Sequence, residues 1–328
     1  MGEQTIVVTG VNGHVGNNLV KEMLEHGYRI RGTVREMSKA KIAKDHDDNN
    51  QLDIHIADVL SKDGWKEIME GADGLIHTAT IYSTTGDAKM ILDTAIKGTE
   101  IVFSAAAAAG IKRVVYTSSV AAIGSTPYGT KDESNWNDNF TLPYTQAKTE
   151  SEHLAWKLAE ELGLDLRVIN PAGILGGSFS RPTPSTEIIG DSMKGKYPLA
   201  PKIPLAFVHV KDVATAHRKA FEVDDASGRY VLAPHQDTNI HQFLKRARQL
   251  YPKEKFPRFG LPNWLMPMAV FQDWFMGIFT KKRLLTRSAA KNFMRGDSKY
   301  SSSKAESELG IVWHSIDDCI HDTVEAYR

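Results

Sequence analysis

The chain opens with a short apolar run followed by evenly spaced glycines. Residues 6–8 are three consecutive β-branched residues, as a strand buried on both faces of a sheet requires. Gly10, Gly13 and Gly16 follow, and apolar residues return at helical spacing over 19–23. This order predicts a strand, a glycine turn and a helix at the start of the fold.

Similar apolar runs recur along the first half of the chain, with helical patterns between them. The runs are short and are flanked by polar or glycine-containing segments, which is typical of strands. Because strands alternate with helices, we predict an α/β fold with a parallel, doubly wound sheet. The strands are expected at 29–34, 53–57, 75–80, 113–117 and 165–170, and the helices at 65–69 and 87–109.

The pattern changes after Asn170, where prolines and glycines become frequent. We expect residues 1–175 to carry the main sheet and residues 176–328 to form a smaller, mostly helical lobe. Such a lobe would lie over the carboxyl ends of the strands, where doubly wound sheets bind substrates. Residues 205–235 contain further strand-like runs and a helix, so this segment is expected to return to the main sheet.

Each glycine of the first turn has its own physical role. Gly10 allows the tight turn, Gly13 lets backbone approach a phosphate, and Gly16 lets the helix pack close to the strand. The N-terminus of that helix offers free N–H groups and the positive end of its dipole to a pyrophosphate. The turn therefore predicts dinucleotide binding, and residues 1–175 are expected to be the dinucleotide-binding domain.

The end of the second strand decides which nicotinamide cofactor is preferred. In NAD-binding folds an acidic side chain near this point holds the ribose 2′-hydroxyl, but Thr33 stands where that acid is expected. Arg35 follows and could pair with a 2′-phosphate, to which Lys39 could add charge. We therefore predict NADP(H) as the preferred cofactor. Glu36 could instead reach the ribose, which leaves NAD(H) as the second choice.

Ser119, Tyr144 and Lys148 form the candidate catalytic set. Ser119 follows the strand at 113–117, and Tyr144 and Lys148 are four residues apart, so they share one helix face. A free tyrosine is too weak an acid at neutral pH, and a neighbouring ammonium lowers its pKa. With a serine hydroxyl to hold the substrate oxygen, the set could move a proton to a carbonyl while a nicotinamide supplies hydride.

The composition is that of an ordinary soluble enzyme and argues against several other classes. The chain has 328 residues, and its 40 basic residues balance 40 acidic ones, so no nucleic-acid partner is expected. Cys319 is the only cysteine and the 12 histidines show no metal-ligand spacing, so neither a disulfide nor a metal site is expected. The first strand begins too early for a signal peptide, and the apolar stretch at 260–272 is too short to span a membrane. We expect a cytoplasmic protein.

These motifs resemble those of the extended short-chain dehydrogenase/reductase family. Its glycine motif TGxxGxxG matches Thr9 to Gly16, and its active-site motif YxxxK matches Tyr144 to Lys148. The resemblance covers nearly the whole chain and implies a Rossmann fold, an NAD(P)-dependent oxidoreductase activity and Ser119 as the catalytic serine. Further matches are Asp58-Val59, His77 to Ala79, Lys97 to Thr99, Tyr116 to Ser119, Asn170 to Gly173, Phe207 to Asp212 and Ser302 to Gly310.

The resemblance also implies where the cofactor lies. Asp58 and Val59 would contact the adenine, Ala79 and Thr80 would lie beside the cofactor, and the backbone of 171–174 would lie near the nicotinamide. The residues expected to bind the cofactor are Thr9, Gly10, Asn12, Gly13, His14, Val15, Gly16, Arg35, Asp58, Val59, Thr78, Ala79, Thr80, Thr117, Tyr144, Lys148, Pro171, Ala172, Gly173 and Ile174.

Within the family, RGTVRE at 31–36 resembles the dihydroflavonol 4-reductase and cinnamoyl-CoA reductase branch, whose arginine there binds the NADP phosphate. NPAGILGG at 170–177 is similar to the NPxxVxGP of that branch, with Gly177 in place of the proline. Nucleotide-sugar epimerases share the catalytic set but usually carry an acid at the end of the second strand. Arg181 is the one candidate for the arginines with which they hold a sugar nucleotide.

We therefore predict reversible, NADPH-dependent reduction of a ketone or aldehyde. Tyr144 would be the general acid, Lys148 its pKa modulator and ribose anchor, and Ser119 the group that positions the carbonyl. One alternative is a nucleotide-sugar epimerase or dehydratase with tightly bound NAD. Another is a non-catalytic NADP-sensing protein, against which the retention of all three residues argues, since a sensor needs no proton donor.

No motif in the sequence identifies the substrate. The stretch 264–279 is rich in aromatic residues and methionine, which fits either a packed amphipathic helix or a lid over an apolar or aryl substrate. We expect His14 to have no catalytic role and His209 to be structural. The expected partner is a small carbonyl or alcohol, and the protein could be a monomer or a homodimer.

Overall fold

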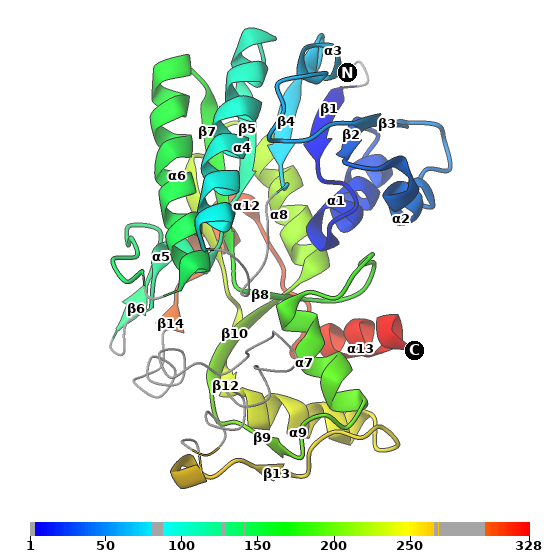
Figure 1. The fold of residues 1–328 in the computed structure, drawn as a ribbon, viewed down its shortest axis with the longest axis vertical. Coiled ribbons are helices and arrows are strands. Elements are labelled where there is room, and N and C mark those ends of the chain that lie inside the picture. Colours follow the sequence, from blue (N-terminus) through cyan, green and yellow to red (C-terminus); the bar gives the residue numbers. More distant parts are fainter. Residues whose placement is uncertain (1–3, 80–87, 126–128, 141, 266–267, 269–298) are drawn as a thin grey trace.

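The computed structural model describes residues 4–79, 88–125, 129–140, 142–265, 268 and 299–328. Its centre is a seven-stranded sheet in the order β11-β7-β5-β4-β1-β2-β3, with every neighbouring pair parallel (Figure 1). The predicted α/β fold with a doubly wound parallel sheet is confirmed. The strands are β1 (Thr5–Thr9), β2 (Arg29–Val34), β3 (Leu52–Ile56), β4 (Gly74–His77), β5 (Arg113–Thr117), β7 (Asp165–Pro171) and β11 (Gly228–Leu232).

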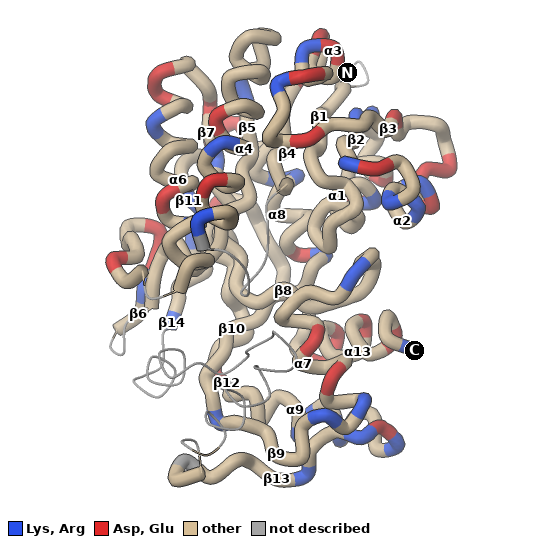
Figure 2. The backbone as a smooth tube through the Cα atoms, viewed as in Figure 1, with Lys and Arg blue, Asp and Glu red and all other residues tan. Residues whose placement is uncertain are grey.

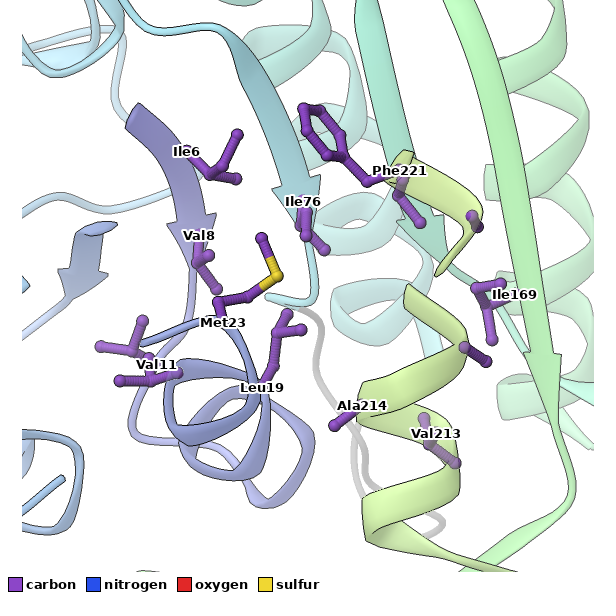
Figure 3. Close-up of a cluster of buried hydrophobic side chains, with 14 of the residues drawn as sticks. Ile6, Val8, Val11, Leu19, Met23, Ile76, Ile169, Val213, Ala214 and Phe221 are labelled. Carbon is purple, nitrogen blue, oxygen red and sulfur yellow. The ribbon is translucent and has the colours of Figure 1, made fainter. Parts of the chain in front are cut away.

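Helices cover both faces of this sheet. On one face lie α1 (His14–Glu25), α8 (Val210–Glu222) and α12 (Ser303–Leu309), and on the other α3 (Trp65–Met69), α4 (Ala88–Ala108) and α6 (Pro143–Leu162). Ile6 and Val8 of β1 pack toward the first face, where Figure 3 shows them near Met23 of α1, and Val7 packs toward the second. Two buried faces therefore explain why the first strand has no polar alternation.

The smaller lobe lies at the carboxyl ends of the main strands (Figure 1). Its centre is a three-stranded sheet of β8 (Gly173–Leu175), β10 (Pro204–His209) and β12 (His235–Asn239), in the order β12-β10-β8. The helices α7 (Pro184–Met193), α9 (Ile240–Leu250) and α13 (Ile316–Tyr327) form an apolar core with this sheet.

The segment 205–235 is shared between the two parts. β11 joins the main sheet beside β7 and α8 packs on that sheet, whereas β10 pairs with β8 and β12 in the small sheet. The remaining elements are η1 (Met37–Ala40), α2 (Lys41–Lys44), α5 (Val120–Ile123), β6 (Thr130–Lys131), β9 (Leu199–Ala200), β13 (Phe259–Gly260), η2 (Asn263–Leu265) and β14 (Lys299–Tyr300).

The surface carries charges of both signs. Basic and acidic residues are interspersed along outer helices such as α6 (Figure 2), in keeping with 40 residues of each sign. In the part of the chain that the structure describes, no helix has the length and apolar character needed to cross a bilayer. Most of the aromatic stretch 264–279 lies outside the described residues.

Candidate active site

The turn between β1 and α1 has the close contacts that its glycines predict. Gly10 has a φ of +69°, in the left-handed region, and its N–H donates to the Thr33 carbonyl at 3.0 Å. A Cβ on Gly16 would lie 2.3 Å from the Gly10 carbonyl oxygen. Only glycine therefore fits where the first turn of α1 passes the end of β1.

The same turn presents backbone donors suited to a pyrophosphate. The first backbone bond into α1 runs from the Asn17 N–H to the Gly13 carbonyl at 2.9 Å. The preceding amides, of His14, Val15 and Gly16, therefore have no intrahelical acceptor, and they lie at the positive end of the helix dipole. Free amides beside a backbone without side chains are what a dinucleotide phosphate needs, so the turn fits such a cofactor.

The end of β4 is held against this turn through Thr9. The Thr9 Oγ accepts hydrogen bonds from the N–H groups of Thr78, at 3.1 Å, and Ala79, at 3.0 Å. A Cβ on Gly10 would lie 3.1 Å from the Ala79 Cα, so the two segments are in close contact. Thr80, the third residue expected beside the cofactor here, lies outside the described residues.

Arg35 and Lys39, the residues predicted to bind a ribose phosphate, follow β2 on the surface. Arg35 is exposed directly after β2, and Thr33 is buried, with its Oγ accepting from the Gly10 N–H at 3.3 Å. The Lys39 ammonium forms a hydrogen-bonded ion pair with Glu36, and this bond lowers the pKa of Glu36. The carboxylate that could have bound a ribose hydroxyl therefore already has a cationic partner.

The other expected cofactor residues follow neighbouring strands. Asp58 is exposed and Val59 half-buried just after β3, next to the end of β2, where the Ala57 N–H donates to the Val34 carbonyl. The backbone of 171–174 connects β7 to β8, and Thr117 ends β5. Parallel strands bring all these segments to one edge of the sheet, which is where doubly wound folds bind ligands.

Two of the three candidate catalytic residues, Ser119 and Lys148, meet at the end of β5, and Tyr144 precedes Lys148 by one turn of α6. Ser119 is the N-cap of α5: its Oγ accepts from the Ala121 N–H at 3.1 Å and donates to the Pro171 carbonyl at 3.5 Å. Tyr144 and Lys148 lie in the first two turns of α6. The Lys148 Nζ donates to the Thr117 carbonyl at 3.1 Å, two residues before Ser119. This bond holds the face of α6 that carries Lys148 against the end of β5, two residues before the serine.

Lys148 is an unusual lysine because its side chain is buried, with 3% of the residue exposed. Burial lowers the pKa of Lys148 from 10.5 to about 8, and the nearby Glu152 carboxylate opposes that change. The ammonium is therefore charged at neutral pH, one helical turn from Tyr144. A buried cation one helical turn from a tyrosine can lower the pKa of its phenol, which a tyrosine acting as general acid requires.

Two buried histidines hold the strand ends around this lysine. The His77 Nδ1 is hydrogen-bonded to the Thr9 Oγ at 2.8 Å, and the His217 Nε2 to the Thr117 Oγ at 2.7 Å. Burial lowers the pKa of His77 to about 3 and that of His217 to about 4. Both rings are therefore neutral at physiological pH and add no charge to the site.

A buried polar network beside the site was not expected from the sequence. Glu152 has no exposed surface; it accepts from the Arg229 Nε at 2.6 Å and from the Asn170 Nδ2 at 2.8 Å. The same Asn170 nitrogen donates to the Ser119 carbonyl at 3.2 Å. The spacing of Lys148 and Glu152, four residues apart on one helix, was the signal in the sequence that could have suggested it.

A second unexpected set of contacts joins α1 to the smaller lobe. The Asn17 Nδ2 donates to the Ser178 carbonyl at 3.2 Å, and the Asn18 Nδ2 to the Gly177 carbonyl at 3.1 Å. His14 is buried beside them, with its ring 5.5 Å from that of Phe179, and burial lowers its pKa to about 4. The helix that would bind the cofactor phosphate is therefore also the helix on which this loop rests.

The structure also shows the surroundings of His209 and Ser118. His209 is fully buried, accepts from the Lys211 N–H at 3.1 Å and stacks on His314. Among the described residues, no group of histidine, cysteine and acidic side chains could hold a metal ion. The Ser118 Oγ is buried and has no hydrogen-bond partner in the described part of the chain, and a polar ligand at this edge could satisfy such an atom.

Comparisons with known proteins show the family to which the chain belongs. The family model described as NAD dependent epimerase/dehydratase family matches residues 6–233. Cinnamoyl-CoA reductase 2 of Medicago truncatula is 32% identical over 341 residues, which covers 100% of this chain and 92% of that protein.

Solved structures show the same fold. Gre2 of Candida albicans in complex with NADPH has a TM-score of 0.79 at 25% identity, covering 99% of this chain and 98% of that one. UDP-glucose-4-epimerase of Stenotrophomonas maltophila has a TM-score of 0.80 at 19% identity, covering 99% of this chain and 98% of that one, which shows the fold alone. The resemblance stated from the motifs is confirmed: the chain belongs to the NAD dependent epimerase/dehydratase family and is an NAD(P)-dependent oxidoreductase.

Proposed function

We propose that the protein reduces a ketone or aldehyde to an alcohol with NADPH, using Ser119, Tyr144 and Lys148. The observation that carries this proposal is the position of Lys148, which is buried, bonded to the Thr117 carbonyl and one turn from Tyr144. Burying a lysine is costly, so a chain that retains one beside a tyrosine and a serine at a strand end has a chemical use for it.

In this proposal each side chain has a separate task. The nicotinamide, when bound, supplies the hydride. Ser119 donates a hydrogen bond to the carbonyl oxygen and holds it beside the phenol. Tyr144 gives its proton to that oxygen as negative charge develops there, and the Lys148 ammonium stabilises the phenolate that remains. In alcohol oxidation the same groups act in reverse.

The preference for NADPH rests on the end of β2. Arg35 is exposed beyond the strand, Thr33 replaces the usual acid, and Glu36 is already paired with Lys39. A guanidinium recognises a 2′-phosphate by paired, charge-assisted hydrogen bonds. NADH lacks that phosphate and would bind more weakly, as the second cofactor.

The substrate class is a carbonyl compound with an apolar or aryl group. The relative from Medicago is named for cinnamoyl-CoA, and we carry over to this chain only the aryl group of that compound, because reduction of its thioester would release the CoA thiol and an aldehyde rather than an alcohol. We assign substrate selection to that lobe and cofactor binding to residues 1–175. The test is a panel of ketones and aldehydes, with and without aryl groups, incubated with NADPH and followed at the nicotinamide absorbance.

The same assay separates the proposal from its alternative. A reductase releases one NADP⁺ for each carbonyl reduced, whereas an epimerase returns the hydride to its own substrate and shows no net change in cofactor. Conversion of a nucleotide sugar at constant nicotinamide absorbance would overturn the proposal. Oxidation of NADPH in step with formation of the alcohol would support it.

A further inference from the structure

A buried ion pair joins α6 to β11 one helical turn beyond Lys148. Glu152 and Arg229 are 77 residues apart in sequence and are joined by a bond of 2.6 Å, with 0% and 6% of their side chains exposed. Buried charges are expensive to desolvate, and such a pair often adds little or nothing to stability compared with apolar residues. Its position next to Lys148 suggests a use other than stability.

The contacts of the arginine fix the position of the pair. The Arg229 Nη1 donates to the carbonyls of Glu133, at 3.1 Å, and Asn135, at 2.6 Å, and the guanidinium lies 3.8 Å from the centre of the Trp136 ring. Residues 133–136, in the loop that precedes α6, therefore hold the Arg229 side chain in place. The Arg229 Nε is then left to bind Glu152 in one geometry.

Glu152 connects this arginine to two parts of the active site. Through Asn170, which donates to both the Glu152 carboxylate and the Ser119 carbonyl, it fixes the main chain that carries the serine. Through space, it is the carboxylate that favours the charged form of Lys148, one turn away on α6. One side chain is therefore linked both to the main chain of Ser119 and to the ammonium of Lys148.

We propose that Glu152 is a positioning residue: held by Arg229, its carboxylate fixes Asn170 against the Ser119 main chain and supplies the counter-charge to Lys148. This inference rests on the proposed function. The titratable and charged groups near Lys148 can be named for the part of the chain that the structure describes. They are Tyr144 and Glu152 on α6, His77 at the end of β4, the Tyr116 ring on β5, His217 of α8 through Thr117, and Arg229 of β11 through Glu152.

The sign of the effect follows from the proton count. In reduction the Tyr144–Lys148 pair must carry its proton when the carbonyl binds, and activity falls at high pH as the pair loses it. A negative charge beside the pair favours the protonated form. Removing the negative charge of Glu152 therefore lets the proton leave at lower pH. The alkaline limb of the kcat profile then shifts to lower pH.

The experiment compares kcat–pH profiles of NADPH-dependent reduction for the wild-type protein and for Glu152→Gln, which keeps the size and one amide oxygen. We expect the alkaline limb to move to lower pH by roughly one pH unit in Glu152→Gln. The control is Glu160→Gln, the same change on the exposed side of α6, whose profile should superpose on the wild type. An unshifted limb in a folded Glu152→Gln protein would overturn the inference.

Two further variants separate the possible failures. Tyr144→Phe tests the proposed function: if it retains turnover, that proposal fails, and if it is inactive while the Glu152→Gln limb is unshifted, only the present inference fails. Should Glu152→Gln not fold, Glu152→Asp keeps the charge on a shorter side chain. It should lower kcat and leave the limb in place, because Asn170 and Ser119 are held less well; an unchanged kcat would contradict the positioning role.

Discussion

Replacing Lys148 by methionine should make the protein more stable and far less active. The Lys148 pKa falls from 10.5 to about 8 on burial, and each tenfold change in an acid dissociation constant corresponds to about 1.4 kcal/mol. At neutral pH the buried ammonium therefore costs the fold about 3 kcal/mol. The bond from Nζ to the Thr117 carbonyl would be lost in the variant, at a cost of about 1 kcal/mol. The expected net gain in the free energy of unfolding is about 2 kcal/mol.

The gain in the free energy of unfolding of Lys148→Met should decrease as the pH rises. Because the folded-state pKa lies below the unfolded one, the penalty is fully present below about pH 8 and disappears as the pH rises toward 10.5. The assay is urea unfolding of Lys148→Met and wild type at neutral pH and again near the upper end of that window. Lys157→Met, an exposed lysine on the same helix, is the control and should change stability by less than about 0.5 kcal/mol.

Two results would refute this reasoning. One is a Lys148→Met protein that is less stable than the wild type at neutral pH, which would mean that the lysine is retained for structure. The other is a stability difference that does not shrink with rising pH. In the same variant, turnover should fall and NADPH should bind more weakly, because the ribose loses its proposed anchor.

The remaining predictions concern the cofactor, the acid and the network. Arg35→Ala should weaken NADPH binding much more than NADH binding in fluorescence titrations, and equal losses would remove the phosphate assignment. Tyr144→Phe should lower kcat by roughly 10²–10⁴-fold with little change in NADPH affinity, as measured in steady state and by titration. Arg229→Leu should lower the free energy of unfolding by about 3–5 kcal/mol in urea, since it strands the buried Glu152 carboxylate. A loss below about 1 kcal/mol would show that the pair is not held as tightly as the structure indicates.

The sequence was most informative where a structure depends on residues that are close together in the chain. The strands at 29–34 and 113–117 have the predicted bounds, and a helix forms at 65–69, where part of one was expected, because residues that end a strand or helix flank each segment. The glycine turn was equally readable, since Gly10 and Gly16 are required by contacts within a few residues of each other.

The sequence was least informative where distant segments meet. Nothing near Glu152 indicates that its partner is Arg229, because that pairing depends on β11 reaching the edge of the sheet beside β7. The same holds for β10, whose apolar run is compatible with either sheet and whose partners are set by the register with β8. Asn17 and Asn18 look like ordinary polar helix residues until the loop at 177–180 is brought against them.

The position of β11 at the edge of the main sheet has a consequence for synthesis on the ribosome. Residues 228–232 pair with β7, but the chain between them first builds most of the small sheet. A nascent chain that has not yet reached Arg229 contains Tyr144, Lys148 and Glu152 but not the arginine that holds the carboxylate in place. The catalytic end of the sheet therefore closes late in translation, after a long non-local contact, and chains that stop before β11 should be clients for chaperones rather than partly active enzymes.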